Sequence, residues 1–165
     1  MLIYLRHGDD HSDDFEYKHD RPLSDVGKRA AVKVAKRLIE KYGHPSIAYV
    51  SPFRRATETL DAMAGCFRRA VTVIRDPRIA QFFAKSQRPP KIGKVLANVI
   101  DVDENKRDFR VRIDKHLDDV MLANHHRSDV VVWCITHTVV LEYVANYFED
   151  PLSDTPRFLE FIVVT

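Results

Sequence analysis

The sequence is organised around one stretch, Leu2-Ile3-Tyr4-Leu5-Arg6-His7-Gly8. Four apolar residues in an unbroken run, closed by a glycine, predict a buried strand of an α/β sheet. Arg6 and His7 stand at the carboxyl end of that strand, which is where open α/β sheets place their ligand crevices. The tripeptide Arg-His-Gly also occurs by chance, and a histidine at a strand end is more often structural than catalytic. The tripeptide alone therefore does not distinguish a structural His7 from a catalytic one, and the rest of the sequence is needed.

Strands alternate with helices along the remaining sequence. Apolar runs predict further strands at residues 47–50, 71–74, 130–135 and 158–164, and helical periodicity predicts helices at about 25–43, 55–64, 109–124 and 140–148. Ser24 is the expected N-cap of the first helix and Gly43 its end. Val26 and, in the third helix, Met121 are expected to face inward. This alternation predicts a single domain over residues 1–165, a three-layer α/β/α sandwich with a mainly parallel central sheet.

Composition narrows the class of protein. A chain of 165 residues is long enough to bury a core without disulfides, and its formal net charge of +2 gives no general affinity for polyanions. Cys66 and Cys134 form no CxxC pattern, so two free thiols are expected. No apolar run approaches the ~20 residues of a membrane span. With no leader-like segment recognised either, we expect a cytoplasmic location and no membrane partner.

Three of the predicted strands end in polar residues. Arg6 and His7 follow the first strand, Ser51 to Arg55 the second, and His137 the strand at 130–135. Parallel strands share one edge for their carboxyl ends, so these side chains are expected to converge. Arginines and histidines around one point form an anion site, and the planar guanidinium matches the oxygens of a phosphoryl group. A neutral imidazole in such a site can attack phosphorus as a nucleophile.

Four motifs along the chain resemble those of the histidine phosphatase superfamily, the phosphoglycerate mutase-like proteins. They are Leu5-Arg6-His7-Gly8, Arg21-Pro22-Leu23-Ser24-Asp25-Val26-Gly27, Val50-Ser51-Pro52-Phe53-Arg54-Arg55-Ala56-Thr57-Glu58-Thr59 and Ile135-Thr136-His137. They occur in the family's order and span nearly the whole chain. The resemblance implies a phosphoglycerate mutase-like fold and a phosphatase that needs no metal and no cofactor.

The resemblance also implies roles for individual residues. His7 is the expected nucleophile, which becomes a phosphohistidine during turnover. Arg6, Arg55 and His137 are the remaining expected residues of the phosphate pocket, and each is counted as both catalytic and phosphate-binding. Arg54 is the alternative to Arg55, from the variable position of the motif.

The short length of the chain and the amino-acid sequences of the motifs most resemble those of the SixA-type phosphohistidine phosphatases. Gln81 stands where related mutases carry a glutamic acid as proton donor, and an amide cannot supply a proton at neutral pH. Asp9, Asp10 or Asp13 could serve as a displaced donor. Imidazole leaves phosphorus readily, because the pKa of its protonated form is near ~6.5, whereas an alkoxide gains roughly 10²- to 10⁴-fold from a general acid.

These features give an expected function with open alternatives. The preferred substrate is phosphohistidine on a partner protein. Small phosphate esters are the second choice, and a pseudo-phosphatase that binds a phosphorylated partner without turnover is the rival from another class. Residues 51–94 hold ten Lys or Arg against three acids, but no nucleic-acid module is recognised, so no nucleic-acid partner is expected. A monomer is the favoured oligomeric state.

Several other residues receive structural interpretations. The acidic loop after Gly8, with His11, Asp13 and Asp14, is expected to be solvated and to hold no metal. Five further histidines are expected at the surface: His19, His44, His116, His125 and His126. Phe82, Phe83, Pro89 and Pro90 form either a rim over the pocket or ordinary loop packing.

Overall fold

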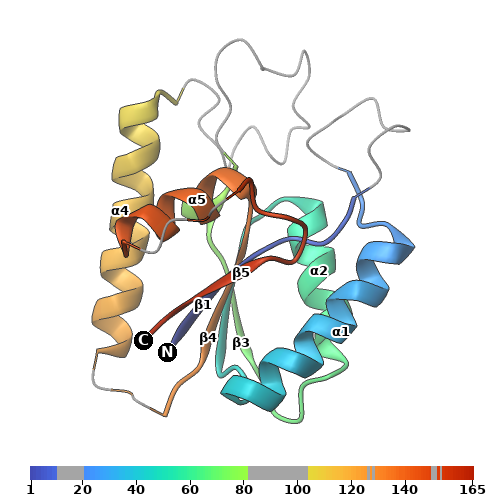
Figure 1. The fold of residues 1–165 in the computed structure, drawn as a ribbon. Helices are drawn as coiled ribbons and strands as arrows, with labels where there is room; N and C mark the ends of the chain where they lie inside the picture. The colour runs from blue at the N-terminus through green and yellow to red at the C-terminus, as the bar shows by residue number, and fades with distance from the viewer. Residues whose placement is uncertain (11–20, 82–103, 126, 128, 150–151, 153) are drawn as a thin grey trace.

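The computed structural model describes residues 1–10, 21–81, 104–125, 127, 129–149, 152 and 154–165 (Figure 1). Within these residues five strands form one sheet in the order β3-β2-β4-β1-β5. The strands are β1 (Leu2–Arg6), β2 (Ile47–Val50), β3 (Thr72–Arg75), β4 (Val132–Thr136) and β5 (Phe161–Val164). The helices are α1 (Asp25–Tyr42), α2 (Arg54–Ala64), α4 (Lys106–Asn124), α5 (Thr138–Tyr147) and the short 3₁₀ helix η1 (Pro77–Ile79). The first four strands run parallel, and β5 lies antiparallel to β1.

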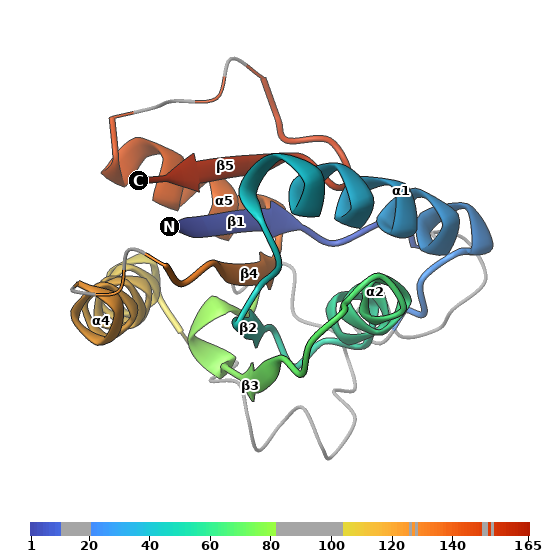
Figure 2. The same cartoon turned by 90° about the horizontal axis from the view of Figure 1, so that it is seen from below.

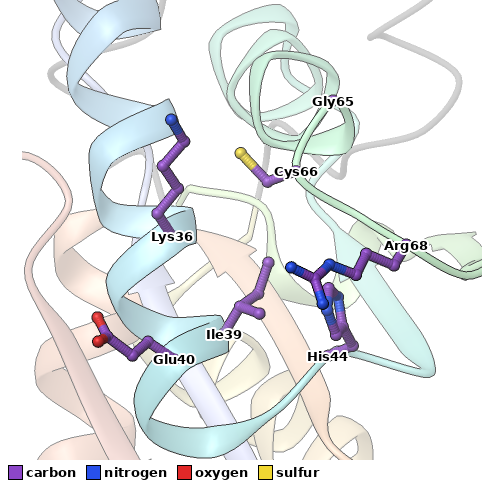
Figure 3. Close-up of a pocket in the computed structure, with 7 residues that line it drawn as sticks. All are labelled: Lys36, Ile39, Glu40, His44, Gly65, Cys66 and Arg68. Atoms are coloured by element: carbon purple, nitrogen blue, oxygen red, sulfur yellow. The ribbon is translucent and has the colours of Figure 1, made fainter.

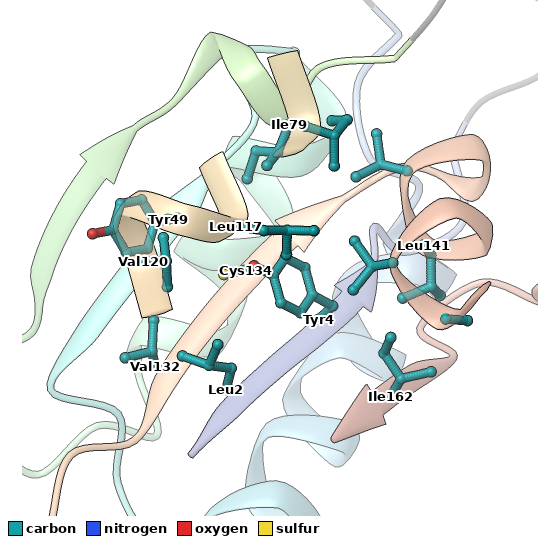
Figure 4. Packing of buried hydrophobic residues seen from close by; sticks show 14 of the residues in the cluster. Leu2, Tyr4, Tyr49, Ile79, Leu117, Val120, Val132, Cys134, Leu141 and Ile162 are labelled. Carbon is teal, nitrogen blue, oxygen red and sulfur yellow. The ribbon is translucent and has the colours of Figure 1, made fainter. Parts of the chain in front are cut away.

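Helices cover both faces of this sheet, so the predicted α/β/α sandwich with a mainly parallel sheet is confirmed (Figure 2). Side chains of β1 alternate between the two faces, as a strand requires. Ile3 and Leu5 pack into the core under α1 and α2, which also contains Trp133. Leu2 and Tyr4 pack into the opposite core, under α4 and α5 (Figure 4). The sheet therefore lies between two separately packed hydrophobic cores.

The first helix begins and ends where the sequence predicts. The hydroxyl of Ser24 accepts a hydrogen bond from the backbone N–H of Gly27 at 2.9 Å, and Gly43 ends the helix with a φ of 89°. Its inward face was predicted less well, because Val26 is 59% exposed. Gly27 is buried instead, and a Cβ built there would lie 2.3 Å from the carbonyl oxygen of Asp9. The missing side chain lets α1 approach the loop that follows β1.

Three other expectations need correction. The last strand starts at Phe161 and not at Phe158, because Leu159 has a φ of 61° and interrupts the extended backbone. Met121 is 40% exposed rather than inward-facing. His116, expected at the surface, is fully buried on the inner face of α4.

Buried His116 is accommodated by polar partners from other elements. Its Nδ1–H donates to the carboxylate of Asp76 at 2.8 Å, and its Nε2 is hydrogen-bonded to the Tyr4 hydroxyl at 3.1 Å. Burial alone would raise the pKa of the Asp76 carboxyl, but hydrogen bonds from His116 and Arg78 outweigh it and hold that pKa well below its usual range. This network fixes the turn after β3 against α4.

Both cysteines are free thiols, as predicted: Cys134 is buried and Cys66 is half-buried. Among the helices described, none combines the length and the apolar character that crossing a bilayer requires.

Candidate active site

The carboxyl ends of β1, β2 and β4 bring the predicted polar residues together. His7 follows β1, Ser51 follows β2, His137 follows β4, and Arg55 lies in the first turn of α2. The exposed fractions of these four residues are 4%, 0%, 1% and 3%, so the cluster is enclosed by protein. The two imidazole rings lie 5.1 Å apart between centroids.

Arg55 bridges the two histidines. Its Nε–H donates to Nε2 of His7 at 3.0 Å, and its Nη2 donates to Nδ1 of His137 at 3.2 Å. Arg54 has a different environment, with a side chain that is 48% exposed and an ion pair to Glu58 at 2.7 Å. The structure therefore places Arg55, and not its neighbour, between the rings.

The hydrogen bonds fix the tautomer of each imidazole. Nδ1–H of His7 donates to the carbonyl of Gly8 at 2.7 Å, which leaves a lone pair on Nε2, the atom that faces Arg55. For His137 the arrangement is reversed. Arginine can only donate, so Nδ1 is the acceptor and Nε2–H donates to the hydroxyl of Ser51 at 2.8 Å.

Both imidazoles are held in the neutral form. Burial, followed by the positive charge of Arg55, lowers the pKa of His7 well below its ordinary value, and the bond to the Gly8 carbonyl only partly opposes this shift. Burial and Arg55 lower the pKa of His137 in the same direction. A neutral His7 has an unprotonated ring nitrogen, as a nucleophile needs.

A residue that sequence reasoning missed connects β1 to α2. The hydroxyl of Thr59 accepts from the backbone N–H of Gly8 at 3.0 Å and donates to the carbonyl of Arg55 at 2.6 Å. The hint in the sequence was its spacing, four residues after Arg55 and so on the same helix face. Thr59 thereby fixes the backbone that carries His7 relative to the backbone that carries Arg55.

Arg6 has different partners from the other three predicted residues. Its Nη1 donates to the carbonyl of Pro156 at 2.5 Å, and its guanidinium lies 4.1 Å above the ring of Phe158. The centroid of the Phe158 ring is also 5.7 Å from that of the His7 ring, so Phe158 packs beside two of the predicted site residues. Among the described residues, Nε of Arg6 is buried and has no hydrogen-bond partner.

The candidate proton donors have different partners in the structure. The side-chain carbonyl of Gln81 accepts from Nη2 of Arg55. A carboxylate oxygen of Asp10 lies 3.6 Å from Nε of Arg55, with Arg21 on its other side at 3.9 Å. The carboxylate of Asp9 is instead held by the hydroxyl of Ser24 at 2.6 Å, in the cap of α1.

Other sequence interpretations have simpler outcomes. His44 is half-buried and His125 is exposed. Several residues lie outside the described part of the chain: His11, Asp13, Asp14, His19, Phe82, Phe83, Pro89, Pro90 and His126. Within the described part, no three His, Cys, Asp or Glu side chains are grouped so that they could hold a metal ion.

A cavity of about 580 Å³ lies between α1 and the end of α2 (Figure 3). Its lining residues are Lys36, Ile39, Glu40, His44, Gly65, Cys66 and Arg68. None of these belongs to the cluster around His7, and the mixture of charges favours no particular chemistry.

Known structures share the fold. YhfR of Bacillus stearothermophilus matches with a TM-score of 0.68 at 21% identity, over 99% of this chain and 91% of that one. The protein histidine phosphatase SixA, complexed with tungstate, matches with a TM-score of 0.59 at 21% identity, over 95% and 81%. A mycobacterial glucosyl-3-phosphoglycerate phosphatase complexed with VO3 matches with a TM-score of 0.63 at 20% identity, over 92% and 83%. At these identities the likeness establishes the fold alone.

The sequence itself matches a family model. No curated protein sequence matches this chain. The model for the histidine phosphatase superfamily (branch 1), in contrast, matches residues 2–159, which is nearly the whole chain and includes all four predicted motifs. The chain therefore belongs to the histidine phosphatase superfamily, and the predicted class of enzyme, a phosphatase of this superfamily, is confirmed.

Proposed function

We propose that this protein is a metal-independent phosphatase that works through a phosphohistidine on His7 and acts on phosphohistidine in a partner protein. One observation carries the proposal: the neutral His7 directs the lone pair of Nε2 toward Arg55, whose Nε lies 3.0 Å away. A phosphoryl group bound by Arg55 would lie next to that lone pair.

The surroundings of His7 favour an anion. Arg55 holds two N–H groups between the histidines, where they donate to the rings until an oxyanion replaces the rings as acceptor. The Nε–H of Arg6, which has no partner among the described residues, is a buried donor that an oxyanion would satisfy. α2 and α5 both begin beside the cluster, and neither has an acidic residue in its first turn, unlike α1 and α4. The positive ends of these two helix dipoles are thus available to a phosphoryl group.

The chemistry takes two steps. Nε2 of His7 attacks phosphorus, the bond from phosphorus to the leaving group breaks with its electron pair, and a phosphohistidine forms on His7. Water then attacks the same phosphorus, and the proton that it loses passes to an oxygen of the phosphoryl group. The N–P bond breaks, releasing inorganic phosphate and returning neutral His7. Donors from Arg55 and Arg6 stabilise the charge that develops on the equatorial oxygens in both steps.

The substrate preference follows from the leaving group. Gln81 accepts a hydrogen bond from Arg55 and has no acidic proton, so it cannot protonate an alkoxide. Protonated imidazole needs no such help, because it leaves as a neutral ring. The structural neighbour SixA is a protein histidine phosphatase. These points together favour phosphohistidine over phosphate esters.

Small phosphate esters remain the second candidate substrate class because Asp10 stands beside Arg55. If esters are turned over, we propose that the carboxyl of Asp10 protonates the leaving oxygen. Asp10→Asn should then lower kcat/KM on esters by roughly 10²-fold or more and change it less than threefold on phosphohistidine. Turnover of esters far above that of phosphohistidine in the wild type would overturn the preferred substrate.

Phosphoryl transfer to His7 has a direct test. The purified protein is mixed with a ³²P-labelled phosphohistidine peptide, quenched without acid and analysed for label on the protein. We expect label in the wild type and in His44→Ala, a half-buried histidine lining the separate cavity, but none in His7→Ala. Binding of the peptide without any label or phosphate release would favour the alternative, a pseudo-phosphatase.

A further inference from the structure

We infer that Phe158 forms an aromatic wall of the active site and selects substrates whose leaving group is a flat ring. This inference rests on the proposed function, because it assigns Phe158 to the leaving-group side of the phosphoryl transfer at His7. The family motifs do not include Phe158, and the sequence placed it inside the last strand.

The position of the ring is the first observation. The centroid of the Phe158 ring lies 5.7 Å from that of the His7 ring and 4.1 Å from the guanidinium carbon of Arg6. His7 is 4% exposed, whereas Phe158 is 40% exposed. An aromatic side chain that touches an enclosed nucleophile and is itself open to solvent lies on the route by which a substrate arrives.

The backbone around Phe158 is the second observation. Leu159 is buried and has a φ of 61°, a left-handed conformation that is unfavourable for leucine. Hydrogen bonds hold this turn to β1 on both sides: Leu159 N–H donates to the carbonyl of His7 at 3.3 Å, and Arg6 N–H donates to the carbonyl of Glu160 at 2.9 Å. The turn therefore holds Phe158 at the site, although the backbone of Leu159 is strained.

The chemistry of the ring indicates the class of leaving group. Aromatic rings attract other rings by offset or edge-to-face stacking, and their faces attract cations. The imidazole of phosphohistidine is flat, and when it is protonated it is cationic until the P–N bond breaks, so it can use both interactions. An aliphatic alcohol can use neither. Phe158 thus supplies selectivity for phosphohistidine and for aryl phosphates through the departing group.

Two phosphonates that bind without being hydrolysed test this inference. Phenylphosphonate and cyclohexylphosphonate have the same charge and similar size and differ in aromaticity. Calorimetry on the wild type should show roughly three- to tenfold tighter binding of the phenyl compound. This ratio should fall to within about twofold of unity in Phe158→Leu and should be retained in Phe158→Tyr. Tyr147→Leu is the matched control, since that ring is 47% exposed at the far end of α5 and should leave the ratio unchanged.

The outcomes separate the two proposals. Equal affinities in the wild type, or the same phenyl preference in Phe158→Leu as in the wild type, overturn the aromatic wall even if His7 becomes phosphorylated. Absence of label on His7 overturns the proposed function even if the phenyl preference depends on Phe158. Equal affinities of the wild type for the two phosphonates would overturn the inference without any variant, so the test does not depend on every variant folding.

Discussion

The adjacent arginines of α2 allow a sharp test of the site. Arg55 is 3% exposed and donates to both histidines, whereas the side chain of Arg54 is 48% exposed and paired with Glu58. Removing one preorganised donor to a developing oxyanion lowers kcat by roughly 10²- to 10³-fold. Since Arg55 offers two donors, Arg55→Ala should lower kcat/KM by roughly 10³-fold or more.

Lysine at the same position separates charge from geometry. Arg55→Lys keeps a positive charge but cannot present two N–H groups in one plane, one 3.0 Å from His7 and the other 3.2 Å from His137. We expect a loss of roughly 10²-fold. Arg54→Ala should stay within about threefold of the wild type and lower the free energy of unfolding by about 0.5 kcal/mol or less, as for other exposed pairs.

The assay is kcat/KM on a phosphohistidine peptide and on p-nitrophenyl phosphate, with urea denaturation to confirm that each variant is folded. The reasoning is refuted if Arg55→Lys keeps more than a third of the wild-type value. It is also refuted if Arg54→Ala loses as much activity as Arg55→Ala, because exposure and hydrogen bonding would then fail to distinguish the two arginines.

Three further predictions concern pH and stability. His7 and His137 have lowered pKa values in the folded protein, so below about pH 6.5 the unfolded chain binds protons that the folded one does not. The free energy of unfolding should therefore fall as the pH drops below 6.5, by up to about 1.4 kcal/mol per pH unit for each histidine, and a flat urea-denaturation profile from pH 7.5 to 5.5 would contradict this. Gly27→Ala should destabilise by about 1–3 kcal/mol, because its Cβ would lie 2.3 Å from the carbonyl oxygen of Asp9, and a higher Tm would contradict that close approach. Ser51→Ala leaves Nε2–H of His137 without its acceptor and should destabilise by about 1–3 kcal/mol, so an unchanged urea midpoint would argue against the bond.

Local sequence signals were sufficient for much of the fold. The unbroken apolar runs of β1 and β2 are buried on both faces and could be recognised without knowing their neighbours. Ser24 and Gly43 set the ends of α1 through bonds within a few residues of themselves. The convergence of His7 and His137 followed from the rule that parallel strands share one edge for their carboxyl ends.

Features that depend on distant partners were not predictable. His116 is buried because Asp76 and Tyr4, 40 and 112 residues away, provide hydrogen bonds for both ring nitrogens. Its helical spacing from Ile113 and Val120 placed it on the inner face of α4, but burial of an imidazole is acceptable only where such partners exist. Periodicity alone carries no information about those partners.

Phe158 illustrates the same limit at the candidate site. The apolar run that follows it resembles a strand, and the sequence carries no signal for the left-handed backbone of Leu159, because leucine does not favour a positive φ. The turn forms because β1 supplies its hydrogen-bonding partners, which is a tertiary effect.

The position of Arg55 joins two requirements that a nucleophilic histidine imposes. The imidazole must be neutral, and the phosphoryl group that it attacks must be bound by cations. A positive charge 3.0 Å from Nε2 meets both, because it disfavours protonation of His7 and also provides N–H donors for an oxyanion at the same place. Before substrate arrives, the carboxylate of Asp10 at 3.6 Å and the carbonyl of Gln81 partly balance this buried charge. An incoming phosphoryl group brings more negative charge than either partner. It can therefore replace Asp10 and Gln81 as the partner of the Arg55 guanidinium without leaving that guanidinium unpaired.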